Sequence, residues 1–397
     1  MRQAALALVL CLVSLGGCLA AQEPAAVVVS SSLQLRQAVA EAKAGDRILV
    51  APGEYEGGLF FKRLRGEPDR PIVIAAQDPA KPPVIRGGGN GMQLAGPAYV
   101  ELRDLHFVGA RNNGLSIDDA GDYAHPAHHI VLAGLHVSEV GPEGNCDGIK
   151  LSGVADFGVR DCTIVRWGSG GSGIDMVGCH RGVIEGNVFR ARVETTSEGV
   201  QAKGGTSEIV IGRNRFEHAG GRGVNIGGST GLEFFRPPLR PGEEHWEAKA
   251  IRVEGNFFIG GQAAVAFVGQ EDCVVRFNTI YRPRRWALRI LQETMAPGFV
   301  PSRRGEFSDN IVVFRSDEWG EGGVNIGPHT APETFRFARN LWYCLDRPDQ
   351  SRPRLPATEE GGVYGVDPML RDPERGDLSL RPGSSATGRG AEALAEE

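Results

Sequence analysis

The sequence has 397 residues, 41% of them hydrophobic, and a formal net charge of −6 at pH 7. This acidic balance excludes a general electrostatic attraction to nucleic acid, so we expect no nucleic-acid partner. The length would allow two or three ordinary domains, but a solenoid grows along one axis and needs no such division.

The first 21 residues have the pattern of a secretory signal peptide. Arg2 supplies a positive charge, and the apolar run from Ala4 to Leu15 is too short to span a bilayer stably. The stretch Leu15-Gly16-Gly17-Cys18 also resembles a bacterial lipoprotein signal, in which Cys18 would carry a lipid anchor to the membrane. Both interpretations stay open. Either one predicts an exported bacterial protein that is periplasmic, extracellular or an outer-membrane lipoprotein.

Residues 31–44 are predicted to form a capping helix that ends at Gly45. The apolar residues at helical spacing are Leu33, Leu35, Val39 and Ala40. A helix at this place would cover the first coil of a solenoid, which otherwise exposes unpaired strand edges.

From about residue 90, a short motif recurs in which Gly or Ala is followed by an apolar, a polar and an apolar residue. Its copies begin at Gly91, Gly114, Gly148, Gly173, Gly199, Gly223, Ala264, Ala287 and Gly323, and most successive copies are 23 to 26 residues apart. Such a period indicates a coil repeat. The repeat predicts an all-β fold, a single-stranded right-handed parallel β-helix that spans residues 28–385.

Alternation along each strand sorts the repeated positions into columns. The predicted interior column is Met92, Leu115, Ile149, Ile174, Val200, Val224, Val265, Leu288 and Val324. The predicted outward column is Gln93, Ser116, Lys150, Asp175, Gln201, Asn225, Ala266, Arg289 and Asn325. A third column, two residues further along each strand, includes Lys203 and Gly227. Coils lie about 4.8 Å apart, so neighbours in a column can touch although they are distant in sequence.

Asparagines and cysteines also recur within the coils. Asn187, Asn214, Asn256, Asn278, Asn310 and Asn340 follow the second strands, and we interpret them as a stacked structural ladder. Cys146, Cys162, Cys179, Cys273 and Cys344 lack the spacing of a zinc or redox motif, and we favour small buried residues over a disulfide or a metal site.

Polar chemistry is concentrated in the middle coils. The candidate substrate-binding residues there are Lys150, Asp175, Gln201 and Asn225, with Lys203 beside them and with Asp147, Glu198 and Arg222 at the strand entrances. A solvated sheet face with compensating charges would look the same. The patch flanks a loop insertion at 229–249, whose Arg236 and Trp246 are further candidates for sugar binding. The alternative is that the insertion's aromatic residues only pin it to the solenoid.

The chain is predicted to close with a last coil and a cap around Val366–Leu370 and Asp377–Gly383. We expect residues 386–397 to be a disordered tail.

The N-terminal region resembles a known family. The stretch from Leu35 through Ala51-Pro52-Gly53-Glu54-Tyr55 to Ala75 is similar to the opening of the chondroitinase B and alginate lyase family of β-helices. The resemblance implies a polysaccharide lyase in which a lysine acts as base, an arginine one coil later assists, and carboxylates hold a calcium ion.

In Glu198-Gly199-Val200-Gln201-Ala202-Lys203, the acid-to-lysine spacing is similar to that of the family. The resemblance therefore implies that Lys203 is the base and that Glu198 is a Ca²⁺ ligand. Two positions depart from the pattern, since Thr196 stands where a second acidic ligand is expected and Gly227 where the arginine is expected. Arg222 or His180 could supply the missing group.

β-Elimination requires a base, a group that stabilises the enolate charge and an acid for the leaving oxygen. The sequence thus predicts an enzyme that cleaves an acidic, uronate-containing polysaccharide, as a monomer. A rival enzyme hypothesis is glycoside hydrolysis by Asp147 and Asp175. The alternative from another class is a non-catalytic protein that binds polysaccharide or has a structural role in the cell envelope.

Overall fold

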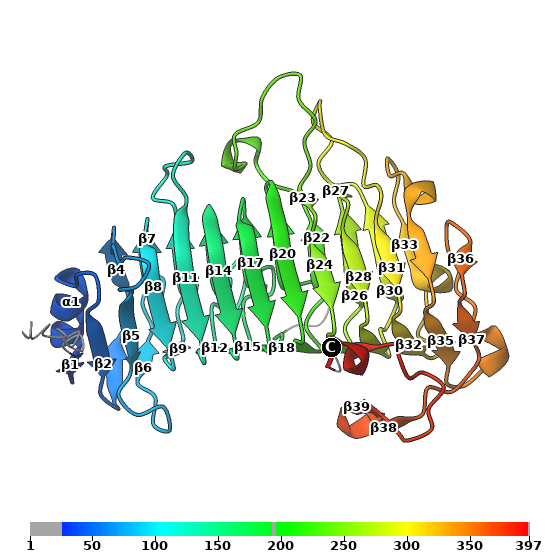
Figure 1. Ribbon diagram of the computed structural model, residues 1–397, viewed down its shortest axis with the longest axis horizontal. Coiled ribbons are helices and arrows are strands. Elements are labelled where there is room, and N and C mark those ends of the chain that lie inside the picture. Colours follow the sequence, from blue (N-terminus) through cyan, green and yellow to red (C-terminus); the bar gives the residue numbers. More distant parts are fainter. Residues whose placement is uncertain (1–25, 193–195, 396–397) are drawn as a thin grey trace, which may run out of the picture.

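The computed structural model describes residues 26–192 and 196–395, so the predicted signal segment with Cys18 lies outside the described residues. Within these ranges, parallel strands form three long sheets along an elongated solenoid (Figure 1). Sheet neighbours are mostly three strands apart in sequence, because successive strands of one coil enter successive sheets. The all-β parallel solenoid is confirmed. In the same ranges, no helix combines the length and the apolar character needed to cross a membrane.

Sheet 1 follows one side of the solenoid. Its strands, in spatial order, are β1 (Ala26–Val29), β2 (Arg47–Val50), β5 (Ile72–Ala76), β8 (Ala98–Arg103), β11 (Ala127–Ala133), β14 (Val154–Arg160), β17 (His180–Glu185), β20 (Thr206–Gly212), β24 (Arg252–Glu254), β28 (Val274–Arg276), β31 (Glu306–Ser308), β34 (Arg336–Ala338) and β36 (Glu359–Glu360), with β23 (Ala248–Lys249) and β27 (Gln270–Glu271) beside this path.

Sheet 2 carries the repeated motif found in the sequence. Its strands are β4 (Leu59–Lys62), β7 (Met92–Ala95), β10 (Leu115–Asp118), β13 (Ile149–Ser152), β16 (Ser172–Val177), β19 (Glu198–Lys203), β22 (Arg222–Gly227), β26 (Ala263–Val268), β30 (Trp286–Leu291) and β33 (Val324–Ile326).

Sheet 3 completes the coils. Its strands are β3 (Glu54–Glu56), β6 (Val84–Arg86), β9 (His106–Val108), β12 (His136–Ser138), β15 (Thr163–Val165), β18 (Val188–Arg190), β21 (Arg215–Glu217), β25 (Phe257–Ile259), β29 (Thr279–Tyr281), β32 (Ile311–Phe314), β35 (Leu341–Cys344) and β37 (Val363–Tyr364).

The predicted interior column forms the core on the sheet 2 side. Each of its members is at most 4% exposed, from Met92 to Val324. The predicted register is also confirmed, since Ile149 pairs with Ile174 and Ile174 with Val200. The predicted outward column differs in one respect: Asp175, Asn225 and Ala266 are fully buried.

The asparagine ladder is confirmed. All six side chains are fully buried, and each amide donates to the side-chain oxygen of the next asparagine at 2.9 to 3.0 Å. Asn340 ends the series by donating to Glu359 at 2.8 Å. Because every buried amide finds a partner, the turn between sheets 1 and 3 is held in the same geometry from coil to coil. Cys162, Cys179, Cys273 and Cys344 are buried free thiols, and Cys146 is a half-buried one.

The capping helix exists but is shorter than predicted. α1 spans Ser32–Ala40, and the Ser31 side chain caps it by accepting from the backbone N–H of Gln34. Leu35 and Val39 are buried against the first coil, whereas Leu33 is 66% exposed. The residues beyond Glu41 form a turn because they lead directly into β2.

Two excursions leave the solenoid on the same side and project together (Figure 1). The first excursion, residues 228–247, corresponds to the insertion predicted at 229–249. The last two residues of that prediction, 248 and 249, form β23 instead. The second, residues 292–305, was not predicted. Their backbones meet where His245 donates to the Gly298 carbonyl and Val300 donates to the His245 carbonyl, both at 2.9 Å.

The C-terminal predictions are wrong in two respects. The expected last coil is an antiparallel hairpin of β38 (Leu370–Asp372) and β39 (Asp377–Leu380), which folds back so that Arg215 reaches the Gly376 carbonyl at 2.7 Å. Residues 386–395 of the predicted tail are also ordered against the solenoid: Ala386 is fully buried, and the Gly390 N–H donates to the Asp309 carbonyl. Small residues let this segment lie close to the coils.

Candidate active site

The candidate site lies on the outer face of sheet 2, on strands β13 to β22. The register brings Lys150, Asp175, Gln201 and Asn225 into one row across these strands. At the strand entrances, Glu198 pairs in register with Arg222. Seven of the predicted residues are therefore grouped as the repeat implies: Lys150, Asp175, Glu198, Gln201, Lys203, Arg222 and Asn225.

Asp175 is the centre of a buried charge cluster. Its Oδ2 is bound by the ammonium of Lys150, which also lies 3.5 Å from Asp147. The second oxygen of Asp175 is buried and has no hydrogen-bond partner among the described residues. Burial and the neighbouring Asp175 carboxylate raise the pKa of Asp147. Burial opposes the charge of Lys150, but Asp175 and Asp147 hold its pKa above the ordinary value.

Lys203 occupies the other side of Asp175. Its Nζ donates to Gln201 Oε1 at 2.8 Å and lies 3.5 Å from Asp175 Oδ2. Lys150 is the nearer partner of Asp175, so Lys203 is held by a neutral amide and only a longer ionic contact. The Lys203 side chain is 15% exposed. The side chain is therefore partly exposed, and its contacts with Gln201 and Asp175 fix the position of the amine.

Arg222 is the cation nearest to the entrance of β19. Its guanidinium donates to Asn225 Oδ1 at 3.0 Å and to Glu293 Oε1 at 2.8 Å. Gly227, where the resemblance places an arginine, has φ +106°, and a Cβ there would lie 1.7 Å from the Val268 carbonyl oxygen. This backbone excludes any side chain at 227, so Arg222 is the arginine that the site can use.

Glu198 has the electrostatics of an acid. Burial raises its pKa to about 7, although Arg222 and Lys203 oppose the shift. The same surroundings do not suit calcium, which takes six to eight oxygen ligands. The groups acting most strongly on Glu198 are cations, and Thr196 in place of a second carboxylate donates its hydroxyl to the Ser169 carbonyl. Among the described residues, no three His, Cys, Asp or Glu side chains are arranged to hold a metal ion.

Glu247 fixes the turn that follows Lys203, and the sequence analysis missed it. This carboxylate is fully buried and accepts from the backbone N–H of Gly204 at 2.8 Å and from the Thr230 N–H at 3.0 Å. The hydroxyl of Thr294, in the second excursion, also donates to it. One side chain thus ties both excursions to the coil that carries the candidate base.

Arg236 fixes the first excursion and is not exposed to a substrate. Its guanidinium donates two hydrogen bonds to Asp119, 117 positions away in sequence, and lies 4.0 Å from the centre of the Tyr123 ring. A Cβ on Gly178 would lie 2.4 Å from the Arg236 Cβ, and one on Gly153 would lie 2.7 Å from its Nε. The Arg236 side chain therefore extends across turns in which glycine leaves room for it, at Gly178 and Gly153.

His180 and Trp246 are not part of the cluster. His180 begins β17 in sheet 1, where its Nδ1 lies 2.9 Å from the Ser207 hydroxyl, and burial together with Arg181 lowers its pKa. The Trp246 ring stacks against Lys249, whose Nζ is 4.4 Å from the ring centre.

Comparison with known proteins gives the handedness of the coils. Residues 90–236 match the family model described as right handed beta helix region. The chain is a right-handed parallel β-helix. Residues 29–119 of this β-helix match the Chondroitinase B family model, which confirms the resemblance found in the sequence but ends before the candidate site begins. No curated protein matches the sequence.

Two solved structures are similar to the β-helix over most of its length. An alginate lyase from Paenibacillus sp. str. FPU-7 is 18% identical with a TM-score of 0.51, and the match covers 77% of this chain and 98% of the lyase. A mannuronic acid specific polysaccharide family 6 lyase from human gut microbiota is 15% identical with a TM-score of 0.52, over 88% and 84% of the two chains. At these identities the likeness shows the fold alone.

Proposed function

We propose that the protein is an exported enzyme that cleaves an acidic, uronate-containing polysaccharide by β-elimination on the outer face of sheet 2. The observation that carries the proposal is the placement of Lys203, partly exposed and held on its strand, between a carboxyl group whose pKa is raised to about 7 and a row of buried charges. The lyase names of both similar structures agree with this chemistry.

The residues divide the reaction among themselves. The Lys203 amine takes the proton α to the uronate carboxylate, and the electrons of that C–H bond form the new double bond as the C–O bond breaks. Arg222 and Lys150 offset the negative charge of the enolate. Glu198 is partly protonated near neutral pH, so it donates its proton to the leaving oxygen. No step is assigned to calcium.

Glycoside hydrolysis by Asp147 and Asp175 has less support. Hydrolysis needs two carboxyl groups that face the sugar from opposite sides. Asp147 and Asp175 are at most 2% exposed, and the Lys150 ammonium contacts both.

The proposal is tested by ultraviolet absorbance of the unsaturated uronate product, with alginate, chondroitin, dermatan, heparan and pectate as substrates. Lys203→Ala should lower the rate on the productive substrate by at least ~10²-fold. The matched control Lys81→Ala changes an exposed lysine on a remote loop and should keep the wild-type rate. Circular dichroism of both variants checks that the coils remain folded.

A non-catalytic polysaccharide-binding function is the second candidate, and the contacts of Lys203 with Gln201 and Asp175 favour it. These contacts would hold the ammonium as a fixed anion-binding group. In that case no unsaturated product and no new reducing ends form on any substrate, and Lys203→Ala only weakens binding.

A further inference from the structure

A polar pocket lies outside the candidate active site, at the ends of strands β4, β7 and β10. It has a volume of about 600 Å³, and its polar lining consists of Arg63, Arg65, Asp119, Asp122, His125 and His128. None of these residues belongs to the cluster around Lys203. The pocket is open enough for a sugar ring, so its charge decides what it can hold.

Both carboxylates of this pocket are hydrogen-bonded within the protein. Asp119 accepts both hydrogen bonds from Arg236, and Asp122 lies 3.0 Å from the Nδ1 of His125. Within residues 26–192 and 196–395, no carboxylate forms an ion pair with Arg63 or Arg65. With neutral histidines, the three arginines Arg63, Arg65 and Arg236 outnumber the two carboxylates by one, so the pocket has a net positive charge, and the exposed Arg63 and Arg65 carry it.

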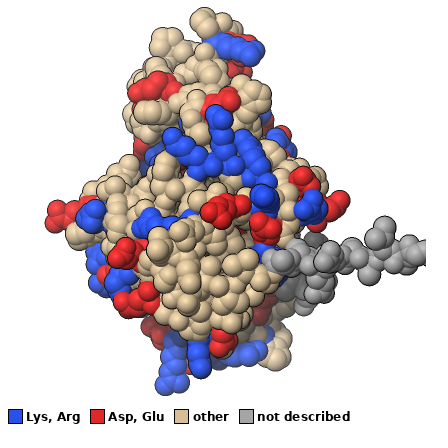
Figure 2. Space-filling model, turned by 90° about the vertical axis from the view of Figure 1, so that its left-hand side faces the viewer, with Lys and Arg blue, Asp and Glu red and all other residues tan. Residues whose placement is uncertain are grey.

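The pKa of the neighbouring His128 is affected by the same positive charge. Burial, His129 and the Arg65 guanidinium each lower the pKa of His128. Figure 2, which views the N-terminal end, shows Lys and Arg side chains gathered in a band beneath the projecting excursions. A carboxylate or sulfate is the ligand that this environment lacks, because a guanidinium fork binds either group through paired hydrogen bonds.

The pocket and the candidate active site lie in one line along the solenoid. Asp119 directly follows β10, and Lys203 ends β19, three coils further along sheet 2. At the usual strand spacing these coils are ~14 Å apart. Arg236 crosses the turns between them and ends on Asp119, which lines the pocket, so the excursion is hydrogen-bonded to the pocket at one end and follows the Lys203 coil at the other.

We infer that this pocket binds the carboxylate or sulfate of an acidic sugar, several units along the same chain from the bond at Lys203. The position of that bond rests on the proposed function, whereas the recognition of an anionic oligosaccharide does not. Arg63 and Arg65 are the recognition groups, and they should favour long acidic chains over short ones.

Calorimetry with oligosaccharides tests the inference without depending on turnover. All proteins carry Lys203→Ala, and the probes are an oligomannuronate hexasaccharide, a chondroitin sulfate hexasaccharide and neutral mannohexaose. Arg63→Gln/Arg65→Gln should raise the Kd for at least one anionic probe about tenfold or more, while Arg47→Gln/Lys81→Gln removes the same charge at exposed sites elsewhere and should leave it unchanged. Loss with oligomannuronate assigns a carboxylate, and loss with chondroitin sulfate alone assigns a sulfate.

Equal Kd values for the two double variants would overturn the inference, as would binding of mannohexaose as tight as that of both anionic probes, or no binding of either anionic probe. Failure of the lyase proposal has a different signature. In that case no unsaturated product forms with the otherwise unmodified chain, yet the Arg63→Gln/Arg65→Gln effect on Kd persists.

Discussion

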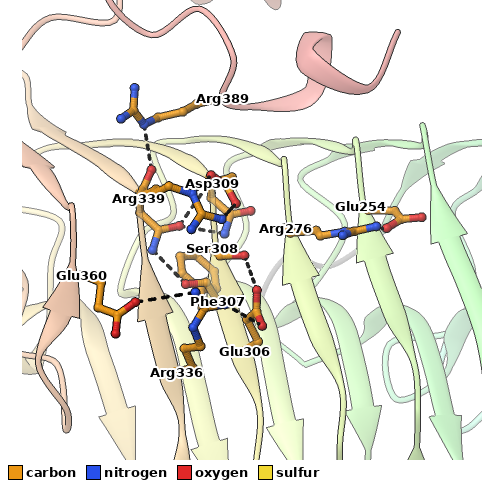
Figure 3. Close-up of polar contacts among 12 residues, drawn as sticks. Glu254, Arg276, Glu306, Phe307, Ser308, Asp309, Arg336, Arg339, Glu360 and Arg389 are labelled. Atoms are coloured by element: carbon orange, nitrogen blue, oxygen red, sulfur yellow. Dashed lines mark hydrogen bonds and ion pairs between the residues drawn. The ribbon is translucent and has the colours of Figure 1, made fainter. Parts of the chain in front are cut away.

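Charged side chains cover two faces of this solenoid in opposite ways. On the outer face of sheet 1, in the last coils, opposite charges on neighbouring coils form ion pairs: Glu254 with Arg276, Glu306 with Arg336 and Asp309 with Arg339 (Figure 3). These arginines are 39 to 49% exposed. On sheet 2, in the middle coils, two lysines share the buried Asp175, and one of its oxygens has no partner among the described residues.

The difference separates structural charges from candidate functional ones. A paired, solvated ladder cancels the repulsion between like charges stacked about 4.8 Å apart, and it needs no perturbed group. The sheet 2 cluster buries charges that are not fully paired, and this burial lowers the free energy of unfolding. Proteins retain such arrangements mainly where the perturbed groups have a task, as the shifted pKa of Glu198 illustrates.

The largest expected effect follows from neutralising the centre of the buried cluster. Asp175→Asn leaves the Lys150 ammonium with the 3.5 Å contact to Asp147 as its one remaining ion pair. Loss of one partner of a buried pair costs about 3–5 kcal/mol of unfolding free energy. Urea denaturation measures the loss. The double variant Asp175→Asn/Lys150→Met should recover part of it. A loss below about 1 kcal/mol for the single variant would show that this cluster contributes no more to stability than the surface ion pairs of sheet 1.

A smaller loss is expected at the pair that fastens the first excursion. Arg236→Lys keeps the charge but cannot donate two parallel hydrogen bonds to Asp119, so stability should fall by about 1–3 kcal/mol. The excursion should also become a protease target, and cleavage by a glutamate-specific protease after the exposed Glu243 or Glu244 measures this. Wild-type resistance in the variant would show that the Glu247 contacts suffice to hold the excursion.

Glu198 predicts a pH dependence of stability. Its pKa in the folded protein is about 7, above the ordinary 4.5, so the folded state binds the proton more tightly. The resulting stabilisation is fully present below pH 4.5 and is lost as the pH rises through 7, with a total of roughly 3–4 kcal/mol. Glu198→Gln should flatten this dependence, which urea midpoints between pH 4.5 and 8 would show. An unchanged slope would mean that Glu198 is ordinarily ionised.

The repeat period of the sequence predicted the strands and the alignment of side chains from coil to coil. Alternation placed Val200 inside and aligned Lys150, Asp175 and Gln201 across strands that are sequential in the repeat. The period says nothing of the course of residues 228–247 and 292–305. Glu247, Glu293 and the partner of Arg236 were therefore missed, and the burial of Asp175 and Asn225 was not foreseen.

The smallest effect is expected on the sheet 1 ladder, and it tests the comparison from the other side. Arg336 lies 3.2 Å from Glu306 and 3.6 Å from Glu360, but its side chain is 48% exposed, so water replaces these contacts when Arg336→Ala removes them. The cost should stay below about 1 kcal/mol and should shrink further in 1 M salt, where screening acts within about 3 Å. A loss as large as that of Asp175→Asn would show that the ladder acts as a cooperative network, in which case pairing alone could not separate structural from functional charge.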